Sequence, residues 1–367
     1  MIDLTTLDFH RTILIAELGG NHDGEPDRAY ELARLAAENG ADIVKFQTYR
    51  AEGLVNKRIS PDRYEHYQRL ELSLEEWPKL ARYVQSLGCH WMSSIWDEHL
   101  LEALDAFLPA YKVGSGDFTN LPLIERMLAT GKPLILSTAM CDQEDVDMTM
   151  AFITRQAPRL VQSGKVALLQ CTAMYDTPSE DDANLAVMEW LRQRYGVPVG
   201  YSNHAVGTRA SLIAAAMGAA IIEVHFTDDK SGSYRDKKLS FTPPELAMLR
   251  ETIEAIPRIR GIERKEVRPS EVEIRNSFRR AVYLRHRVPR GHVVTSEDLV
   301  CLRPNEGIDA RRYYDLIGKR TTIDIDGLSP LSSGDFEEPH ELEPTLPSGR
   351  ASDEVSKREG DEAPADR

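Results

Sequence analysis

The feature that most restricts the fold of this sequence is a regular alternation of short apolar runs with amphipathic stretches over its first two thirds. The stretches between the runs, such as DRAYELARLAAENG and TRASLIAAAMGA, have helical patterns, and most of them end at a glycine suited to a helix C-cap. This alternation indicates a parallel sheet, and eight units within about 250 residues predict an α/β fold, the (β/α)8 or TIM barrel. The runs lie at 13–18, 42–48, 90–94, 111–115, 134–138, 166–172, 197–202 and 220–226.

Each apolar run becomes polar at its carboxyl end. In a (β/α)8 barrel these ends open on one face, where the active sites of this fold are built. One or two such residues would be explained as strand caps, but polar residues end all eight runs. The sequence therefore predicts an active site made from the run ends, which supply Glu17, Lys45, Gln47, Ser93, Ser94, Lys112, Ser115, Ser137, Thr172, Ser202, His204, Glu223 and His225.

Two of these run ends carry lysines, Lys45 and Lys112, and several others carry serines. Ammonium groups neutralise negative charge, while hydroxyls and backbone N–H groups donate hydrogen bonds to phosphate and carboxylate oxygens. The combination is suited to a phosphorylated carboxylate.

Two histidines, His204 and His225, follow the last two runs. Neighbouring strands lie about 4.8 Å apart, so both imidazoles would reach one cation. Glu223 stands two residues before His225 and therefore on the same side of its strand. The sequence predicts a metal site here.

The chain changes character after the barrel. We expect the barrel to occupy residues 1–256 and a charged, irregular linker to occupy 257–277. Residues 278–338 carry short strand and turn patterns typical of a small β-rich module. Residues 339–367 are acidic and almost without large apolar side chains, which predicts a disordered tail.

Composition restricts partners and location. The formal net charge of −14 disfavours nonspecific binding to nucleic acid and to anionic membranes. The four cysteines are scattered and form no CxxC pair, and the start MIDLTTLDFH has no pattern of a secretory signal. A cytoplasmic protein with reduced thiols is expected, and Cys171 is interpreted as a buried strand cysteine.

Several long motifs lie at the ends of the predicted strands. They are IAELGGNHDG (15–24), GADIVKFQTY (40–49), YKVGSGDFTNLPLIE (111–125), TGKPLILSTAM (130–140), LLQCTAMYDTP (168–178), VPVGYSNHAVG (197–207) and AAIIEVHFT (219–227). These motifs resemble those of the sialic acid synthase family. The resemblance spans residues 10–338, and LRPNEGI with LIGKR makes the β-rich module similar to the antifreeze-like (SAF) domain of that family.

The resemblance implies condensation of phosphoenolpyruvate with an N-acyl hexosamine aldehyde to a nonulosonic acid, with release of phosphate. It implies a divalent metal, Mn²⁺ first and Mg²⁺ or Co²⁺ as alternatives, and a homodimer whose SAF domain reaches the partner's barrel. The positions that match phosphoenolpyruvate contacts of the family are Lys45, Ser94, Lys112, Ser115, Ser137 and Ser202.

Other matched positions concern the sugar, the metal and proton transfer. His204 and His225 match the metal ligands, and Arg303 matches an arginine that enters the partner's site. Glu17 and Glu223 are the candidates for proton transfer, with the step of each left open. The remaining implied residues are Asp117 as catalytic and Gln47, Tyr175 and Asp236 as sugar contacts.

The departures from the family pattern fall on the sugar side. Asp117 replaces a common Glu, Ala139 a Gly, Ala173 an Asn and Asp176 a Pro, while NEGI replaces GTGI or GNGI in the SAF-like module. The sequence therefore leaves two acceptor sugars possible, N-acetylmannosamine and a 2,4-diacetamido-6-deoxyhexose. It also does not decide whether the sugar is phosphorylated.

The sequence is compatible with three alternative functions. A Schiff-base aldolase would use Lys45 or Lys112 as its nucleophile and need no metal. A second alternative is another phosphoenolpyruvate-condensing synthase, acting on a phosphorylated pentose or tetrose. The SAF-like module disfavours this alternative. A non-catalytic sugar-binding protein of the same fold is disfavoured by the intact Glu17, Lys45, His204 and His225.

Overall fold

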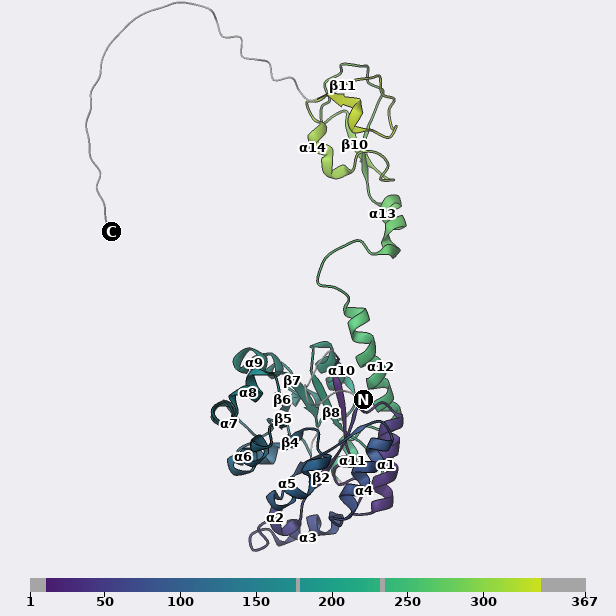
Figure 1. The fold of residues 1–367 in the computed structure, drawn as a ribbon. Coiled ribbons are helices and arrows are strands. Elements are labelled where there is room, and N and C mark those ends of the chain that lie inside the picture. Colours follow the sequence, from purple (N-terminus) through teal and green to yellow (C-terminus); the bar gives the residue numbers. More distant parts are fainter. Residues whose placement is uncertain (1–10, 176–178, 232–234, 338–367) are drawn as a thin grey trace, which may run out of the picture. The chain divides into compact units, whose positions relative to one another are not determined.

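Eight parallel strands close into a barrel in the order β1 to β8, and the helices of the same segment surround them (Figure 1). The computed structural model describes residues 11–175, 179–231 and 235–337. All eight predicted strands are confirmed, with ends within two residues of those expected. The strands are β1 (Ile13–Glu17), β2 (Ile43–Thr48), β3 (His90–Ile95), β4 (Tyr111–Val113), β5 (Leu134–Ser137), β6 (Val166–Cys171), β7 (Val199–Asn203) and β8 (Ile221–His225).

The helices pack their apolar faces against the outside of the barrel. In α1 the buried residues Ala29, Leu32, Ala33 and Ala36 recur with helical spacing. The chain leaves α1 through Gly40, whose φ of +94° suits glycine. The helices of this unit are α1 (Pro26–Glu38), α2 (Ala51–Leu54), α3 (Pro61–Leu70), α4 (Glu76–Ser86), α5 (Leu101–Leu104), α6 (Leu121–Ala129), α7 (Gln143–Gln156), α8 (Pro158–Gln162), α9 (Val187–Tyr195), α10 (Arg209–Ala216), α11 (Arg235–Leu239) and α12 (Pro243–Arg260).

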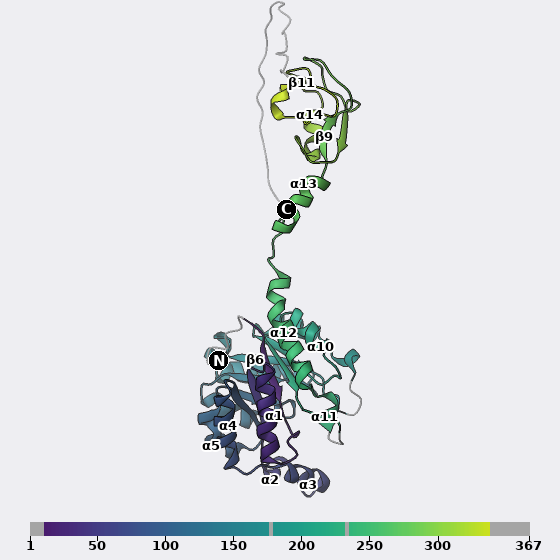
Figure 2. The ribbon, with the colours of Figure 1, turned by 90° about the vertical axis from the view of Figure 1, so that its right-hand side faces the viewer.

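The barrel has two separate apolar cores. One lies between the strands and the helices, and α12 contributes to it beside α1 and α10 (Figure 2). The other fills the inside of the barrel below the carboxyl ends of the strands. It consists of Ile13, Ile15, Ile43, Met92, Ala110, Ile135, Ala167, Leu169 and Ile221.

The chain divides after Gly261 into two compact units. Helix α12 extends to Arg260, past the expected barrel end at 256. The expected linker 257–277 is not irregular throughout, because α13 (Val272–Phe278) forms in it. None of the residues of α13 is buried, so no apolar stripe marked this helix in the sequence.

The second unit is small and contains two antiparallel strand pairs. These are β9 (Ala281–Leu284) with β10 (Leu299–Leu302) and β11 (Arg320–Thr321) with β12 (Phe336–Glu337), and α14 (Tyr313–Leu316) lies between them in sequence. Its core includes Val282, Leu299, Ile308, Ile325 and Phe336.

Three of the expectations concern residues outside the described ranges, namely the start MIDLTTLDFH, the departure at Asp176 and the tail 339–367. Within the described ranges, no helix combines the length and the apolar character needed to cross a membrane.

Candidate active site

Each barrel strand carries one side chain that points into the barrel directly above the inner apolar core. On β1 and β2 these are Glu17 and Lys45, two residues after the core residues Ile15 and Ile43. Side chains of a strand alternate between its faces, so a residue two positions on points the same way. We call this set the inner ring: Glu17, Lys45, Ser94, Lys112, Ser137, Cys171, Ser202 and Glu223.

Lys45 joins three members of the inner ring. Its Nζ forms an ion pair with Glu17, donates a hydrogen bond of 3.2 Å to Ser94 Oγ, and lies 3.7 Å from Glu223 Oε2. Burial lowers the pKa of Lys45, but the carboxylates of Glu17 and Glu223 raise it by more, and the pKa lies above its ordinary value. Lys45 therefore keeps its positive charge.

Lys112 shares the carboxylate of Glu223 with Lys45. Its Nζ donates a hydrogen bond of 2.7 Å to Ser137 Oγ and lies 3.6 Å from Glu223 Oε1. Ser202 Oγ donates to the same Oε1 at 3.0 Å. Burial raises the pKa of Glu223, but Lys112 and Lys45 lower it by more, so that this carboxylate is ionised between two cations.

A second layer lies above the inner ring near β1, β2 and β8. Gln47 Nε2 donates a hydrogen bond of 2.8 Å to Glu17 Oε1, and Asp236 Oδ2 lies 3.7 Å from His225 Nδ1. Gly19, with φ +51°, separates them, since a Cβ there would stand 3.2 Å from Asp236 Oδ2 and 3.3 Å from Gln47 Nε2. The glycine lets the backbone pass between these side chains.

The two histidines meet as the sequence predicted. The ring centroids of His204 and His225 are 5.0 Å apart, and Tyr175 lies edge-on to His204 at 5.1 Å. Both Nδ1 atoms are buried and have no hydrogen-bond partner among the described residues. Burial, assisted by His225, lowers the pKa of His204 to about 3, so this imidazole is neutral.

This pair fits a divalent metal. Neutral imidazoles with unpartnered nitrogens are the form that binds metals. No group of three or more His, Cys, Asp or Glu side chains able to hold a metal occurs in the described part of the chain. The protein would thus supply two imidazoles and leave positions open for substrate or water.

Three other predicted site residues have contacts of their own. Asp117 follows β4, accepts a hydrogen bond of 3.2 Å from Asn120 Nδ2, and has a pKa raised by burial. Ser115 Oγ accepts from the backbone N–H of Ala139 at 3.1 Å. Arg303 lies in the second unit, where its Cζ is 5.1 Å from the ring centroid of Phe278.

Cys171 belongs to the inner ring, which the sequence interpretation did not include. The expected burial is confirmed, and burial raises its pKa to about 12. The side chain is therefore a neutral thiol and not a nucleophile. Its position two residues after Leu169 was the signal that could have found it.

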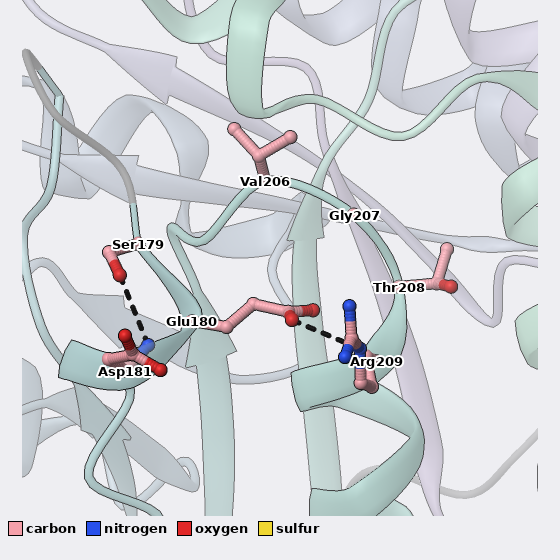
Figure 3. Close-up of a pocket in the computed structure, with 7 residues that line it drawn as sticks. All are labelled: Ser179, Glu180, Asp181, Val206, Gly207, Thr208 and Arg209. Carbon is pink, nitrogen blue, oxygen red and sulfur yellow. Dashed lines mark hydrogen bonds and ion pairs between the residues drawn. The ribbon is translucent and has the colours of Figure 1, made fainter.

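A separate open pocket of about 510 Å³ lies beside the loops that follow β6 and β7 (Figure 3). Arg209 Nε lies 3.0 Å from Glu180 Oε2 across it. Among its described lining residues none is a predicted site residue, and the charge of Arg209 is already paired. The lining consists of Ser179, Glu180, Asp181, Val206, Gly207, Thr208 and Arg209.

The chain is similar in sequence to a family of known proteins. Residues 32–265 match the model of the NeuB family. The N,N'-diacetyllegionaminic acid synthase of Legionella pneumophila is 35% identical over 325 residues, which cover 85% of this chain and 91% of that protein. The chain belongs to the NeuB family.

Other relatives of this NeuB family chain are similar over most of its length. The human N-acetylneuraminate-9-phosphate synthase is 29% identical, with 86% of this chain and 90% of that protein covered. The crystal structure of an N-acetylneuraminic acid synthetase from Leptospira borgpetersenii in complex with citrate has a TM-score of 0.65 at 29% identity, covering 74% of this chain and 93% of that one. The resemblance to sialic acid synthases is confirmed, and the chain is a transferase-type synthase.

Proposed function

We propose that this chain condenses phosphoenolpyruvate with an N-acyl hexosamine aldehyde to a nonulosonic acid and releases phosphate. The observation that carries the proposal is the pair of buried lysines, Lys45 and Lys112, each with a serine partner in the inner ring. Burying two ammonium groups is costly unless anions compensate them. Phosphoenolpyruvate brings a phosphate and a carboxylate, in addition to the carboxylates already present.

The inner ring would bind and orient phosphoenolpyruvate. Lys45 with Ser94 and Lys112 with Ser137 offer two cationic sites, each with a hydroxyl beside it. Charge-assisted hydrogen bonds of this kind are about twice as strong as neutral ones. They would hold C3 of the enol phosphate against the aldehyde and convert a collision into a positioned encounter.

The reaction joins C3 of phosphoenolpyruvate to the aldehyde carbon. The resulting cation at C2 takes up water, and the tetrahedral intermediate expels phosphate by cleavage of its C2–O bond. Water gives up both of its protons. One reaches the aldehyde oxygen, and the other leaves the C2 hydroxyl as the C2 ketone forms and goes to the released phosphate. Glu17 and Glu223 would move these protons. The contacts of Glu17 with Gln47 and Lys45, and that of Glu223 with Ser202, support this proposal.

The acceptor sugar would occupy the layer above the ring. His204 and His225 would hold a divalent cation, Mn²⁺ first, which when bound supplies Lewis-acid polarisation of the aldehyde oxygen. Asp236 and Tyr175 flank these histidines and would position the sugar. The names of the relatives support acylamino sugars as acceptors, since they are synthases of N,N'-diacetyllegionaminic acid and of N-acetylneuraminate 9-phosphate.

We further propose that the second unit is an SAF domain and that the protein is a homodimer. The β-rich pattern of residues 278–337 and the exposed Arg303 beside Phe278 support this assignment. In this arrangement Arg303 would enter the partner's site, where its planar fork of donors suits an acyl carbonyl oxygen.

One experiment tests the function directly. Purified protein is incubated with phosphoenolpyruvate, Mn²⁺ and each of several sugars, namely N-acetylmannosamine, its 6-phosphate and a 2,4-diacetamido-6-deoxyhexose. Phosphate release and the product mass are measured. Phosphate release with a product equal to sugar plus pyruvate is expected, and its absence with every sugar would reject the proposal.

The Schiff-base alternative is separated in the same assay. Burial lowers the pKa of Lys112, as a nucleophilic lysine requires, but its Nζ is occupied by Ser137 Oγ and the Val113 carbonyl. Borohydride should therefore trap no covalent adduct.

A further inference from the structure

Three aromatic side chains form a cluster at the carboxyl ends of β2 and β3. Tyr49 follows β2 and stacks on Trp96, which follows β3, with ring centroids 5.3 Å apart and planes inclined by 19°. Tyr67, from α3, meets Tyr49 edge-on at 5.2 Å and Trp96 at 6.3 Å. We propose that Tyr49, Tyr67 and Trp96 form one wall of the acceptor-sugar site and that this wall selects a sugar without a phosphate group. The inference rests on the proposed function and deepens it.

The strands direct this aromatic wall toward the site. Tyr49 stands two residues after Gln47, and Trp96 two residues after Ser94. Gln47 and Ser94 both point inward, because they bond to Glu17 and Lys45. By the alternation of strand side chains, Tyr49 and Trp96 continue on the same side above them.

The wall faces the candidate sugar residue Tyr175 across the barrel mouth. In a barrel closed in the order β1 to β8, the ends of β2 and β3 lie opposite those of β6 and β7. Tyr175 follows β6 and contacts His204, which follows β7. Burial, with smaller contributions from Tyr67 and Asp236, raises the pKa of both Tyr49 and Tyr175.

The wall offers hydrogen-bonding groups that the protein leaves unused. Tyr49 is 6% exposed, yet its hydroxyl has no hydrogen-bond partner among the described residues. This hydroxyl does not belong to the fully buried polar atoms that lack a partner, so it keeps accessible surface through which a ligand can reach it. Aromatic rings with a few polar groups are typical of small-molecule sites, and sugar hydroxyls and C–H groups would match both parts.

Two carboxylates act on the wall, and the cations of Arg50 and Lys57 already have partners. The carboxylates that act on Tyr49 are Glu71 and Asp236. Nearby, the Arg50 guanidinium is bound to the carboxylates of Asp97 and Glu52, and Lys57 Nζ lies 4.7 Å from the ring centroid of Tyr64. A phosphate placed here would meet the like charges of Glu71 and Asp236. A neutral acylamino hexose is therefore favoured.

The test compares variants of the wall by steady-state kinetics. Tyr67→Leu and Tyr49→Phe should raise the KM for the sugar about tenfold, the effect of losing a contact worth about 1.4 kcal/mol. The KM for phosphoenolpyruvate and kcat should change less than twofold. Tyr64→Leu on the same helix is the control and should change neither KM. Unchanged sugar KM in both wall variants, or an equal rise for phosphoenolpyruvate, would overturn the inference.

A second arm tests the charge argument. Wild-type kcat/KM should be at least tenfold higher for N-acetylmannosamine than for its 6-phosphate, and the opposite order would overturn the selection. If the protein releases phosphate with none of the sugars tested, the proposed function fails. Calorimetric binding of N-acetylmannosamine then tests the wall independently. Tyr67→Leu must weaken that binding, and equal binding would overturn the inference.

Discussion

The Nζ of Lys112 donates a hydrogen bond of 2.7 Å to Oγ of Ser137, which stands on the neighbouring strand at the same end of the barrel. Lys45 repeats this arrangement with Ser94 across β2 and β3. Both hydroxyls fix a long lysine side chain that would otherwise have many rotamers. Both lysine ammonium groups are therefore held in place before an anionic substrate binds.

We predict that Lys45→Ala and Lys112→Ala each raise the KM for phosphoenolpyruvate much more than that for the sugar. A lost hydrogen bond to a charged group costs about 1.5–3 kcal/mol, or about tenfold to a hundredfold in KM. Lys79→Ala, at an exposed position of α4, is the control. Circular dichroism verifies folding. A rise confined to the sugar KM would show that the lysines do not bind phosphoenolpyruvate.

We predict that His204→Ala and His225→Ala each abolish tight binding of Mn²⁺, measured by calorimetric titration, and also abolish activity. The reason is that the structure brings two buried, unpartnered imidazole nitrogens together and supplies no larger ligand cluster among the described residues. His99→Ala, at an exposed position, should bind Mn²⁺ like the wild type. Full activity in excess chelator, or in either histidine variant, contradicts the metal site.

The free energy of unfolding should decrease as the pH is lowered, because of His22. This residue is 2% exposed, its Nδ1 accepts a hydrogen bond of 3.1 Å from the Gly24 N–H, and burial lowers its pKa from 6.5 to about 4. The unfolded chain binds the proton more tightly than the folded one. The contribution of neutral His22 to the free energy of unfolding is therefore complete above pH 6.5 and is lost between pH 6.5 and 4.

The expected loss from His22 is about 3 kcal/mol over that range. Urea unfolding of the wild type and of His22→Gln between pH 7.5 and 4 measures it, since the variant keeps an acceptor but cannot take up the proton. The free energy of unfolding of the wild type should fall relative to that of the variant. A difference that is independent of pH would mean that His22 does not titrate on unfolding.

The barrel and most of its inner ring could be predicted because both follow from local pattern. A strand has period two, so Lys45, Lys112 and Glu223 are inward as soon as the runs are located. The meeting of His204 with His225 followed from the neighbouring positions of β7 and β8. These relationships need no knowledge of how loops fold.

Residues carried by loops and short polar helices could not be predicted in this way. Helix α3 buries Leu70 and otherwise has little apolar pattern, so nothing in the sequence placed Tyr67 against Tyr49. Asp236 was proposed from resemblance, because its approach to His225 depends on the loop after β8. Helix α13 was missed because it has no buried face to give it a period.

The last prediction concerns Arg303 and the homodimer. Arg303 and Phe278 contact each other within the second unit, and α13 and its flanking residues 262–280 could carry that unit to a second barrel. We expect His225→Ala and Arg303→Ala to be inactive alone but active when mixed. A hybrid dimer has one barrel with intact histidines that receives an intact Arg303 from the other chain.

Random exchange makes half of the dimers hybrids with one complete site, so about a quarter of wild-type activity should return. Exchange is verified with differently tagged chains, and a mixture of His204→Ala with His225→Ala is the control, because no barrel in it has both histidines. Confirmed exchange without recovery would place Arg303 in its own chain's site or outside any site. An active monomer at the assay concentration, established by light scattering, would rule out completion of the site by a partner chain.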